Sequence, residues 1–534
     1  MTVHSPEQSF DEANLPLTIP EPEQARASES GRTVRPARRL ETVKWVFSFP
    51  VMLATALVVA VFSFARAFVV DPDLWWHIKT GQLILATHHW PTTDPYSFTV
   101  HGQPWIAYEW GGEVLLGWVS RIGGVRGLDF LLIALGAAIM IALYVLGTLR
   151  SGKSKAGFLA AALLLPLATP SFTLRPQMLG YLFLVLTLIA LELFRQGKRW
   201  AAWTLPALML VWVNTHGTFI IGLGAIFIYW ICGLVEFQKG NIGAKRWSPK
   251  ERRSLLLVFL LCLGVLPITP YGARLAAYPF NMAFSQPLNV ATIGEWQPMV
   301  VQPIWGSVFL VLVLGFFLLQ MAFDFKWRLE ELLLFVGGMV MACLHRRFLL
   351  VFVPFAAPLL AAVAARWIDI YRRDKDKYIL NAVLIAGMMA AVIYYFPGRS
   401  QLDQRVAEDF PVFAVKYLRQ HPVPGPMFNS YGFGGYLIGA GFKTFIDGRG
   451  DVFERGGVFG DFVRLDSLRP GGLDVLRRYG IQSCLLKSDE SLATVLLASP
   501  DWKRVYTDGT SALFVRTGSE ERPATTGATS PRTR

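Results

Sequence analysis

DPDLWWHIKTGQLILATHHWPTTDPYSFTVHGQPWIAYEWGGE, residues 71–113, follows directly on the first long apolar run of the chain. The stretch is dense in histidines, tryptophans and carboxylates, and its acidic residues are Asp71, Asp73, Asp94, Glu109 and Glu113. A loop between two membrane spans does not need so many carboxylates among aromatic residues in order to fold. We therefore interpret this stretch as half of an active site, held at the outer face of a membrane.

The composition of the whole chain indicates a polytopic membrane protein. Of its 534 residues 53% are hydrophobic and 17% are charged, with a mean hydropathy of +0.40. Long apolar runs alternate with short charged loops. The net charge of +13 is concentrated in those loops, where it sets topology, so we expect no nucleic-acid partner. No paired or metal-ligand spacing links the four cysteines, Cys232, Cys262, Cys343 and Cys484, so we expect neither a disulfide nor a cysteine metal site.

Eleven apolar runs are candidate spans, and they predict a polytopic α-helical membrane protein of about eleven spans. They lie at 45–65, 128–149, 156–170, 178–194, 201–214, 218–235, 254–270, 304–323, 329–344, 348–365 and 378–396. The third, fifth and ninth runs are shorter than the ~20 residues of a perpendicular span, and could be tilted, broken or re-entrant.

Positive charge alternates along the connections between these runs. One set of connections carries 25 Lys and Arg, counted from the N-terminal tail, and the other set carries 8. The basic set is 32–44, 150–155, 195–199, 236–253, 324–328 and 366–377. The positive-inside rule then predicts a cytoplasmic N-terminus, and an odd number of spans places residues 397–534 outside.

Four segments of the chain follow from these patterns. We predict a disordered cytoplasmic tail at 1–40, not a cleaved signal peptide, and a transmembrane domain at 41–397 whose first outer loop is 66–127. A small extracytoplasmic α/β domain at 398–520 precedes a disordered tail at 521–534. Within that domain we expect helices at 404–420, 473–479 and 489–498, a Gly-rich turn at 432–436, and strands at 425–430, 443–447, 481–487, 503–507 and 511–516.

The clusters that mix polar and aromatic residues at span ends all fall on the predicted outer face. They are 171–177, 214–218, 269–296 and 344–348, besides the opening stretch. Polar groups near the apolar slab are costly, and they indicate function by default. We therefore predict one site assembled from several outer loops.

Asp71 and Asp73 are the first candidates for the chemistry, with Glu109 as a second choice. The two aspartates, separated by one proline, could share a proton, bind a divalent cation such as Mg²⁺ or Mn²⁺, or act as general base on an acceptor hydroxyl. Asp73 could instead cap the helix that starts after it. The tryptophans Trp75, Trp76, Trp90 and Trp105 favour an interfacial helix on the membrane surface over sugar stacking.

Cations at span ends on the outer side are candidates for binding phosphate, because guanidinium matches its oxygens and keeps its charge in an apolar site. They are Arg175, Arg274, Arg346 and Arg347, together with His216. Arginines in such places can also reach lipid head groups, and a lone histidine can serve a helix end. Glu295 and His77 are candidate acceptor-binding or secondary residues. The segment IDGRGDVFERGG, 446–457, could add Asp447 or Arg449.

Several of these motifs resemble the GT-C superfamily of membrane glycosyltransferases. The matching stretches are DPDLWWHIKTGQLI, PTTDPYSFTVHGQPWIAYEW, LRPQ, NTHG and NSYGFGGYLI followed by KTFIDGRGDVF, and they are similar to a bacterial GT-C-like family. More distant resemblance is to protein mannosyltransferases, lipid A aminoarabinose transferases and oligosaccharyltransferase catalytic subunits. The resemblance implies a GT-C-like fold in the bacterial cytoplasmic (inner) membrane, with Asp71 or Asp73 as the acidic motif.

What the resemblance implies for function is transfer of a sugar from a polyprenyl-phosphate-type donor to a glycan, lipid or protein acceptor, with inversion. No residue matches the second-loop acid of some members, which leaves open whether a metal takes part; no other cofactor is implied. The alternatives are a non-catalytic GT-C-like envelope assembly protein and a lipid or solute transporter. A transporter would need ionisable residues in mid-span, where Glu192 is the main example.

Overall fold

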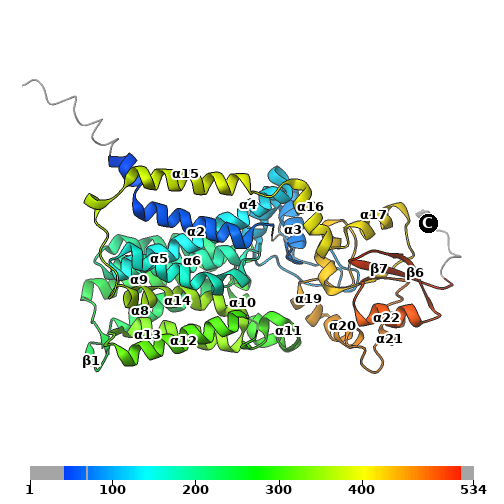
Figure 1. Ribbon diagram of the computed structural model, residues 1–534. Helices are drawn as coiled ribbons and strands as arrows, with labels where there is room; N and C mark the ends of the chain where they lie inside the picture. Colours follow the sequence, from blue (N-terminus) through cyan, green and yellow to red (C-terminus); the bar gives the residue numbers. More distant parts are fainter. Residues whose placement is uncertain (1–40, 68–69, 303, 519–534) are drawn as a thin grey trace, which may run out of the picture.

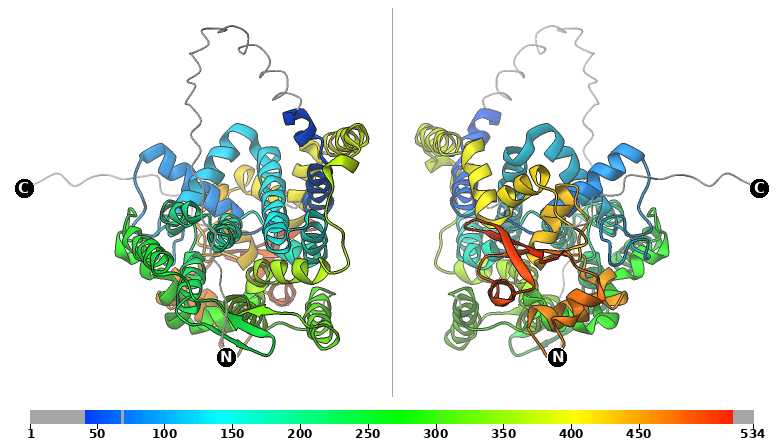
Figure 2. Two further views of the ribbon diagram at one scale, coloured as in Figure 1. Left: turned by 90° about the vertical axis from the view of Figure 1, so that its left-hand side faces the viewer. Right: turned by 90° about the vertical axis from the view of Figure 1, so that its right-hand side faces the viewer.

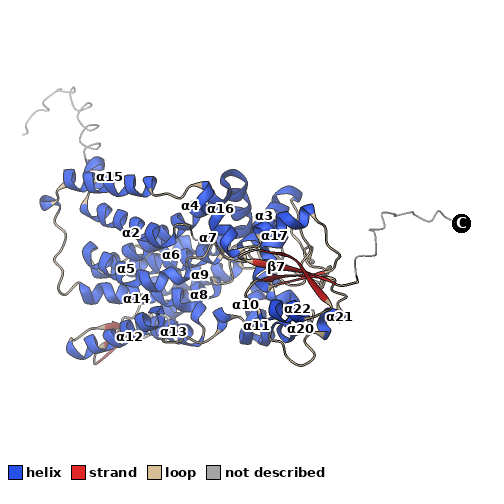
Figure 3. Ribbon diagram, turned by 45° about the vertical axis from the view of Figure 1, so that its right-hand side comes forward, coloured by secondary structure: helices blue, strands red, loops and turns tan. Residues whose placement is uncertain are grey.

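The computed structural model describes residues 41–67, 70–302 and 304–518. Long helices lie side by side in a bundle, and a four-stranded sheet lies beyond one end of it (Figures 1 and 3). The tails predicted at 1–40 and 521–534 fall outside the described residues.

Each of the eleven predicted apolar runs contains a helix. These helices are α2 (Phe49–Ala65), α4 (Trp110–Ser151), α5 (Ser154–Ala168), α6 (Gln177–Arg195), α7 (Leu205–Val213), α8 (Phe219–Cys232), α9 (Pro249–Val265), α12 (Ile304–Ala322), α13 (Leu329–Leu344), α14 (Leu349–Ala364) and α15 (Tyr378–Tyr394).

Four helices of the described chain are long and apolar enough to cross a membrane. They are Trp110–Ser151, Gln177–Arg195, Ile304–Ala322 and Arg346–Ala364, and a fifth results if Tyr378–Tyr394 and Arg399–Asp409, bent by 60°, form one span. The protein is therefore a multi-pass membrane protein with several apolar spans. The total of eleven stays a prediction.

Helix α4 begins well before the span predicted at 128–149. Gly124 interrupts it with φ 55° and ψ −150°, a backbone conformation open essentially to glycine. The part of α4 before this break packs against α3 (Leu74–Thr87), and the part after it belongs to the bundle. The first outer loop is thus largely helical, and α3 brings its polar residues next to the start of α4.

The loops predicted to be cytoplasmic meet at one end of the bundle. Short strands β1 (Phe237–Lys239), β2 (Ile242–Ala244) and β3 (Trp327–Arg328) join two of them in a small sheet. Arg150 pairs with Glu331, Arg195 pairs with Glu330, and Arg328 Nη1 lies 2.7 Å from Glu192 Oε2. Glu192 is therefore ion-paired in a cluster that fastens α4, α6 and α13 together.

The loops predicted to be outer meet at the opposite end, beside the C-terminal sheet (Figure 1). The Gly111 amide donates to the Asn214 carbonyl at 2.9 Å, and the Ala107 amide donates to the Tyr271 hydroxyl oxygen at 3.1 Å. The two sets of connections thus separate in space as their charges predict. Which end faces the cytoplasm stays a prediction.

The C-terminal region is built around four strands in the order β4-β5-β7-β6. Strand β4 pairs parallel with β5, and β5–β7 and β7–β6 pair antiparallel, so that Phe428 lies opposite Cys484 and Leu485 opposite Leu513. Its elements are α16 (Arg399–Asp409), α17 (Val412–Gln420), β4 (Met427–Asn429), α18 (Gly434–Gly439), α19 (Gly450–Arg455), α20 (Val458–Asp466), α21 (Asp474–Arg478), β5 (Ser483–Lys487), α22 (Ser491–Ala498), β6 (Trp502–Thr507) and β7 (Ser511–Arg516).

Three local predictions for this region are wrong. Residues 404–420 form two helices because Pro411 interrupts the run. The predicted turn at 432–436 is helical, in a short 3₁₀ turn and α18. The predicted strand at 443–447 makes one isolated bridge, between Thr444 and Ser97. The partner of this segment is the first outer loop and not the sheet. The alternating pattern of 443–447 therefore reflects burial against that loop.

Arg449 holds the C-terminal region to the first outer loop. Its guanidinium is fully buried, makes two 2.7 Å bonds to the Asp447 carboxylate and also bonds Asp94. Its Cζ lies 5.0 Å from the ring centre of Tyr96 and 4.8 Å from that of Trp105. Arginine suits this place because its planar fork bonds both carboxylates while its faces contact rings.

Two of the four tryptophans expected at the membrane surface are buried in this contact. Trp76 and Trp105 are 2% and 1% exposed and belong to one apolar cluster with Phe428 and Phe445. Trp75 packs edge-on against Phe410 and Tyr436 of the C-terminal region, while Trp90 stays 38% exposed. The interpretation as a platform on the membrane surface is therefore wrong for Trp76 and Trp105, whose rings pack with the C-terminal region. The right-hand view of Figure 2 shows this region, coloured yellow to red, in front of the helix bundle.

Replacing Arg449 by methionine should lower the free energy of unfolding by about 3–5 kcal/mol, because Asp94 and Asp447 would stay buried without their cation. Thermal unfolding of the detergent-solubilised protein measures the change. The control is Arg405→Met, which removes an exposed pair with Glu408 and should have little effect. Equal unfolding of the two variants would contradict the assigned role of Arg449.

Candidate active site

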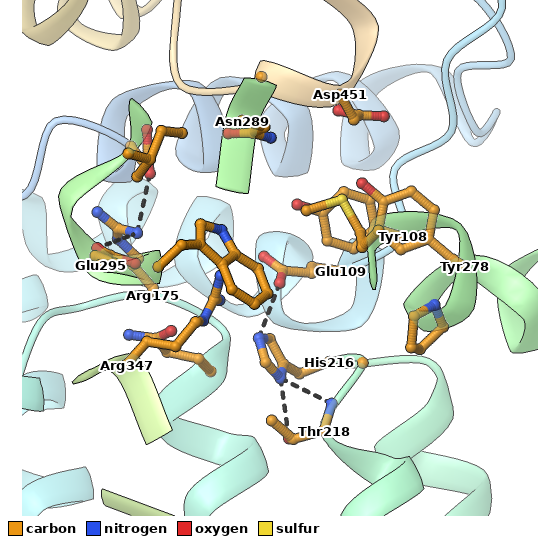
Figure 4. A pocket seen from close by; sticks show the side chains of 18 of the residues that line it. Tyr108, Glu109, Arg175, His216, Thr218, Tyr278, Asn289, Glu295, Arg347 and Asp451 are labelled. Atoms are coloured by element: carbon orange, nitrogen blue, oxygen red, sulfur yellow. Dashed lines mark hydrogen bonds and ion pairs between the residues drawn. The ribbon is translucent and has the colours of Figure 1, made fainter. Parts of the chain in front are cut away.

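A cavity of about 650 Å³ opens where the outer-end loops meet the C-terminal region (Figure 4). Its walls come from α3, the start of α4, the segments before α6 and α8, helices α10 (Ala273–Ser285) and α11 (Pro287–Thr292), the turn between α13 and α14, and the start of α19. Segments far apart in sequence therefore contribute to one space, as the shared face of their loops predicts.

Arg175, in the loop before α6, joins three carboxylates from two other segments. Its Nε lies 2.6 Å from Asp71 Oδ2, and its Nη1 lies 3.1 Å from both Asp73 Oδ2 and Glu295 Oε1. Its side chain is 19% exposed, so these bonds form largely out of water and are stronger than surface pairs. The prediction that the acidic pair and an outer arginine share a site is consistent with these distances.

Asp73 occupies the N-cap position of α3, but its side chain does not cap the helix. Asp73 Oδ1 instead accepts from Trp76 Nε1 at 3.2 Å, and Oδ2 faces Arg175. Its backbone amide donates to Asp71 Oδ1 at 2.9 Å. Asp71 therefore positions Arg175 and the backbone of Asp73, while Asp73 itself lines the cavity.

Glu109, the residue before α4, is bonded to a fixed histidine. The Thr218 amide donates to His216 Nδ1 at 3.1 Å, so the ring proton is on Nε2, which lies 3.1 Å from Glu109 Oε1. His77 Nε2 lies 3.5 Å from the other oxygen of Glu109. His216 therefore orients Glu109. The sequence predicted phosphate binding for His216, whereas its neighbour in the structure is this carboxyl group.

The carboxyl groups of the cavity differ in acidity. Burial raises the pKa of Asp73 to about 6, against the lowering effect of Arg175. Burial raises the pKa of Glu109 to about 8 and lowers the pKa of His216 to about 3. Arg175 holds the pKa of Glu295 below its usual range. At neutral pH Asp73 is therefore ionised, whereas Glu109 is mainly protonated and His216 is neutral.

Arg347 is the cavity cation that no carboxylate of the described chain holds in an ion pair. Its Cζ lies 4.1 Å from the centre of the Trp296 ring, which supports the side chain from one face. The Tyr181 hydroxyl donates to its carbonyl at 3.2 Å. A supported guanidinium that makes no ion pair can bind an anionic ligand.

The other predicted residues lie in different surroundings. His77 is buried, lines the cavity, and its Nδ1 lies 3.1 Å from Glu113 Oε1. Arg346 is exposed and does not line the cavity. Arg274 is exposed in the first turn of α10 and does not line it either. The two arginines Arg346 and Arg347 are neighbours in sequence, but the turn that carries them places only Arg347 in the cavity wall.

Sequence reasoning missed four residues that line the cavity: Tyr108, Tyr278, Asn289 and Asp451. It suggested that the segment 446–457 could add Asp447 or Arg449, whereas both are buried with Asp94 and do not line the cavity. The glycines that alternate with charged residues in DGRGD were a usable signal for Asp451, because glycine lets the backbone approach another group closely. Tyr278 and Asn289 gave no such signal.

A divalent cation does not fit the Asp71–Asp73 pair as it is built. All four carboxylate oxygens accept bonds, from Arg175, the Asp73 amide and Trp76. Among the residues that the structure describes, no three or more His, Cys, Asp or Glu side chains are arranged to hold a metal ion. The Arg175 guanidinium supplies the positive charge between the acidic groups.

The fold is shared with membrane glycosyltransferases of known structure. The oligosaccharyltransferase of Archaeoglobus fulgidus, solved with a tethered acceptor peptide containing the NVT sequon, matches at TM-score 0.50 and 11% identity, over 81% of this chain and 69% of that chain. The chain has a GT-C-like fold. Archaeoglobus fulgidus AglB in complex with an inhibitory peptide and a dolichol-phosphate matches at TM-score 0.50 and 11% identity, over 92% and 76%.

A third similar structure is ArnT from Cupriavidus metallidurans bound to undecaprenyl phosphate, at TM-score 0.47 and 12% identity, over 90% of this chain and 99% of that chain. No protein-family model matches the sequence, and no curated protein does. The resemblance to GT-C proteins predicted from the sequence is thus confirmed at the level of the fold.

Removal of Arg175 should turn the acidic cluster into a cation site. We expect the wild-type protein to bind no Mn²⁺ at micromolar concentration in an electron paramagnetic resonance titration, and Arg175→Ala to bind it, because Asp71, Asp73 and Glu295 would lose their shared cation. Arg347→Ala, which leaves these ion pairs intact, is the matched control. Tight Mn²⁺ binding by the wild type that Asp73→Asn abolishes would contradict this assignment.

Proposed function

We propose that this protein is a membrane glycosyltransferase that moves a sugar from a polyprenyl-phosphate-type donor to an acceptor at the outer face of the membrane. One observation carries the proposal: an ionised carboxylate, Asp73, and a cation without a carboxylate partner, Arg347, line the same cavity. Transfer from a lipid-linked phosphate needs a base for the acceptor and a positive charge for the leaving group. The GT-C-like fold supports the same reading.

Asp73 is the base in this proposal. It takes the proton from an acceptor hydroxyl while that oxygen attacks the anomeric carbon of the donor sugar. The bond from this carbon to the phosphate oxygen breaks, and the phosphate keeps the electron pair. A single displacement of this kind inverts the anomeric centre. Glu109 is the weaker candidate because it is mainly protonated at neutral pH.

Arg347 holds the leaving phosphate, and the apolar wall of the cavity holds the lipid chain. Ile220 and Ile221 from α8, Phe280 and Phe284 from α10, and Met341 from α13 line the same space. Phe284 is 82% exposed, so this wall continues onto the surface of the bundle. An apolar chain leaving the cavity beside these residues would enter the bilayer directly.

In this proposal the protein lies in the bacterial cytoplasmic membrane, with its N-terminus inside and the C-terminal region outside. The charge difference between the two sets of loops supports this orientation. The acceptor, a glycan, lipid or protein, would then approach from the outer side. No divalent cation takes part in the proposed step, because Arg175 already lies between Asp71, Asp73 and Glu295.

Asp73→Asn should lower kcat by about 10²–10⁴-fold, the usual contribution of a general base. Glu109→Gln should lower it far less, since glutamine resembles the protonated form that Glu109 already has. The wild-type rate should rise as pH increases through about 6, where Asp73 loses its proton. The measurement is sugar transfer from polyprenyl-phosphate donors in proteoliposomes.

Two results would refute the assignment of the base. A larger loss in Glu109→Gln than in Asp73→Asn would move the chemistry to Glu109. Unchanged donor pools and unchanged envelope glycans in cells that carry Asp73→Asn would favour a non-catalytic assembly protein instead.

Arg347→Ala should raise the KM for the lipid-linked donor by roughly tenfold or more, because a bond from guanidinium to phosphate is charge-assisted. Arg346→Ala is the matched control: the neighbouring arginine lies outside the cavity and should leave this KM within about twofold. A larger effect in Arg346→Ala would show that the phosphate binds elsewhere.

A further inference from the structure

The DGRGD segment, 447–451, forms a wall of the cavity from the C-terminal region. Asp447 and Arg449 are buried with Asp94, while Gly448, Gly450 and Asp451 line the cavity. A Cβ on Gly448 would lie 1.6 Å from Asp73 Oδ1, so only glycine lets the backbone approach this carboxylate. Because Arg449 anchors the segment, its position over the cavity is fixed.

One buried polar atom in this part of the cavity, Asn289 Oδ1, has no hydrogen-bond partner among the described residues. Tyr278 is 6% exposed and Asn289 is 3% exposed, and both line the cavity. The Tyr278 hydroxyl interacts with Asp451 and Tyr108. Asn289 Nδ2 donates to Gln286 Oε1 at 2.9 Å, which turns Oδ1 away from that contact. Buried polar groups are nearly always bonded, so Asn289 Oδ1 points to a ligand that bonds it.

The same part of the cavity is polar without being cationic. The rings of Tyr108 and Tyr278 are stacked with centres 3.9 Å apart and an angle of 19°. Asp451 is 3% exposed, and its Oδ2 lies 2.9 Å from Arg455 Nη2. In Figure 4 Tyr108, Tyr278 and Asp451 lie to the right of Glu109 and Arg175, Arg347 and Glu295 to its left, with Asn289 above Glu109 between the two groups. The two ends of the cavity therefore suit different chemical groups.

We propose that Tyr278, Asn289 and Asp451 form a subsite for a neutral, hydroxyl-bearing sugar ring. Asn289 Oδ1 and the Asp451 carboxylate accept hydrogen bonds, so they suit the O–H donors of a sugar. The Tyr278 hydroxyl can donate or accept. The Tyr108–Tyr278 pair offers an apolar surface for the C–H face of such a ring. An anionic group would be repelled by Asp451 and would bind at the arginine end instead.

This subsite rests on the proposed function for the identity of the ring, which is either the transferred sugar or the acceptor sugar. Both are sugar rings that would present hydroxyl groups to these side chains. Asp451 is the second residue of α19 and Asn289 lies against Gly450 at its start, which places the subsite beside Gly448 and hence beside Asp73. A hydroxyl of a ring bound here lies within the same cavity as the base.

Ligand-observed NMR on the protein in nanodiscs tests the subsite without any transfer reaction. The probes are methyl mannopyranoside, methyl galactopyranoside and methyl arabinofuranoside. At least one should give a saturation-transfer signal with the wild type, and Tyr278→Phe and Asn289→Leu should each weaken it by about fivefold. The control Tyr479→Phe removes a hydroxyl that bonds Asp461 outside the cavity, and should not change binding.

The variants also separate a subsite from a structural role. Tyr278→Phe should weaken sugar binding while it shifts the melting temperature no more than Tyr479→Phe, which also removes a hydroxyl beside an aspartate. Absence of binding of all three glycosides to the wild type, or equal binding to the wild type, Tyr278→Phe and Asn289→Leu, would overturn the proposal.

Transfer kinetics then identify the ring and keep the two proposals apart. A raised KM for the acceptor in Tyr278→Phe assigns the acceptor sugar, and a raised KM for the lipid-linked donor assigns the transferred sugar. If transfer depends on Asp73 but both KM values stay unchanged, the subsite is wrong and the proposed function stands. If Asp73→Asn has no effect while sugar binding still depends on Tyr278, the proposed function is wrong and the subsite stands.

Discussion

The bonds between Arg175 and its three carboxylates are the constraint on which the cavity depends. They connect Asp71 and Asp73, near the start of the first outer loop, with the loop before α6 and with Glu295 before α12. Without the guanidinium, three acidic groups would face one another in a poorly hydrated space, and mutual repulsion would raise their pKa values or separate the loops. One cation therefore sets both the geometry and the charge of this end of the cavity.

The same arrangement gives the carboxyl groups of the cavity different protonation states at neutral pH. Asp73 stays ionised because Arg175 offsets part of the effect of burial, whereas Glu109, which faces two neutral histidines, holds its proton to about pH 8. Environment thus separates a base from a neutral neighbour within one pocket. Arg347, supported by Trp296 and not by a carboxylate, keeps its charge available for a ligand.

How much of this could be predicted from the sequence depends on which forces leave a pattern. Apolar runs gave the helices, and the alternation of basic loops grouped Asp71, Arg175, His216 and Glu295 at one end, because both follow from the cost of placing charge in a bilayer. Side-chain direction leaves no such pattern. Arg346 and Arg347 are neighbours, yet only Arg347 lines the cavity, and Trp76 is buried by a domain contact that no local periodicity encodes.

The C-terminal region is a part of the site and not an attached module, and DGRGD shows why. Neighbouring residues of this segment serve different purposes: Arg449 bonds Asp447 and Asp94 in the buried contact, and Gly448, Gly450 and Asp451 face the cavity. Since Arg449 is bonded to Asp94 of the first outer loop, which also carries Asp73, the anchor and the proposed base belong to one connection. A shift of the C-terminal region would therefore move Gly448 against Asp73 and change the space in which a substrate binds.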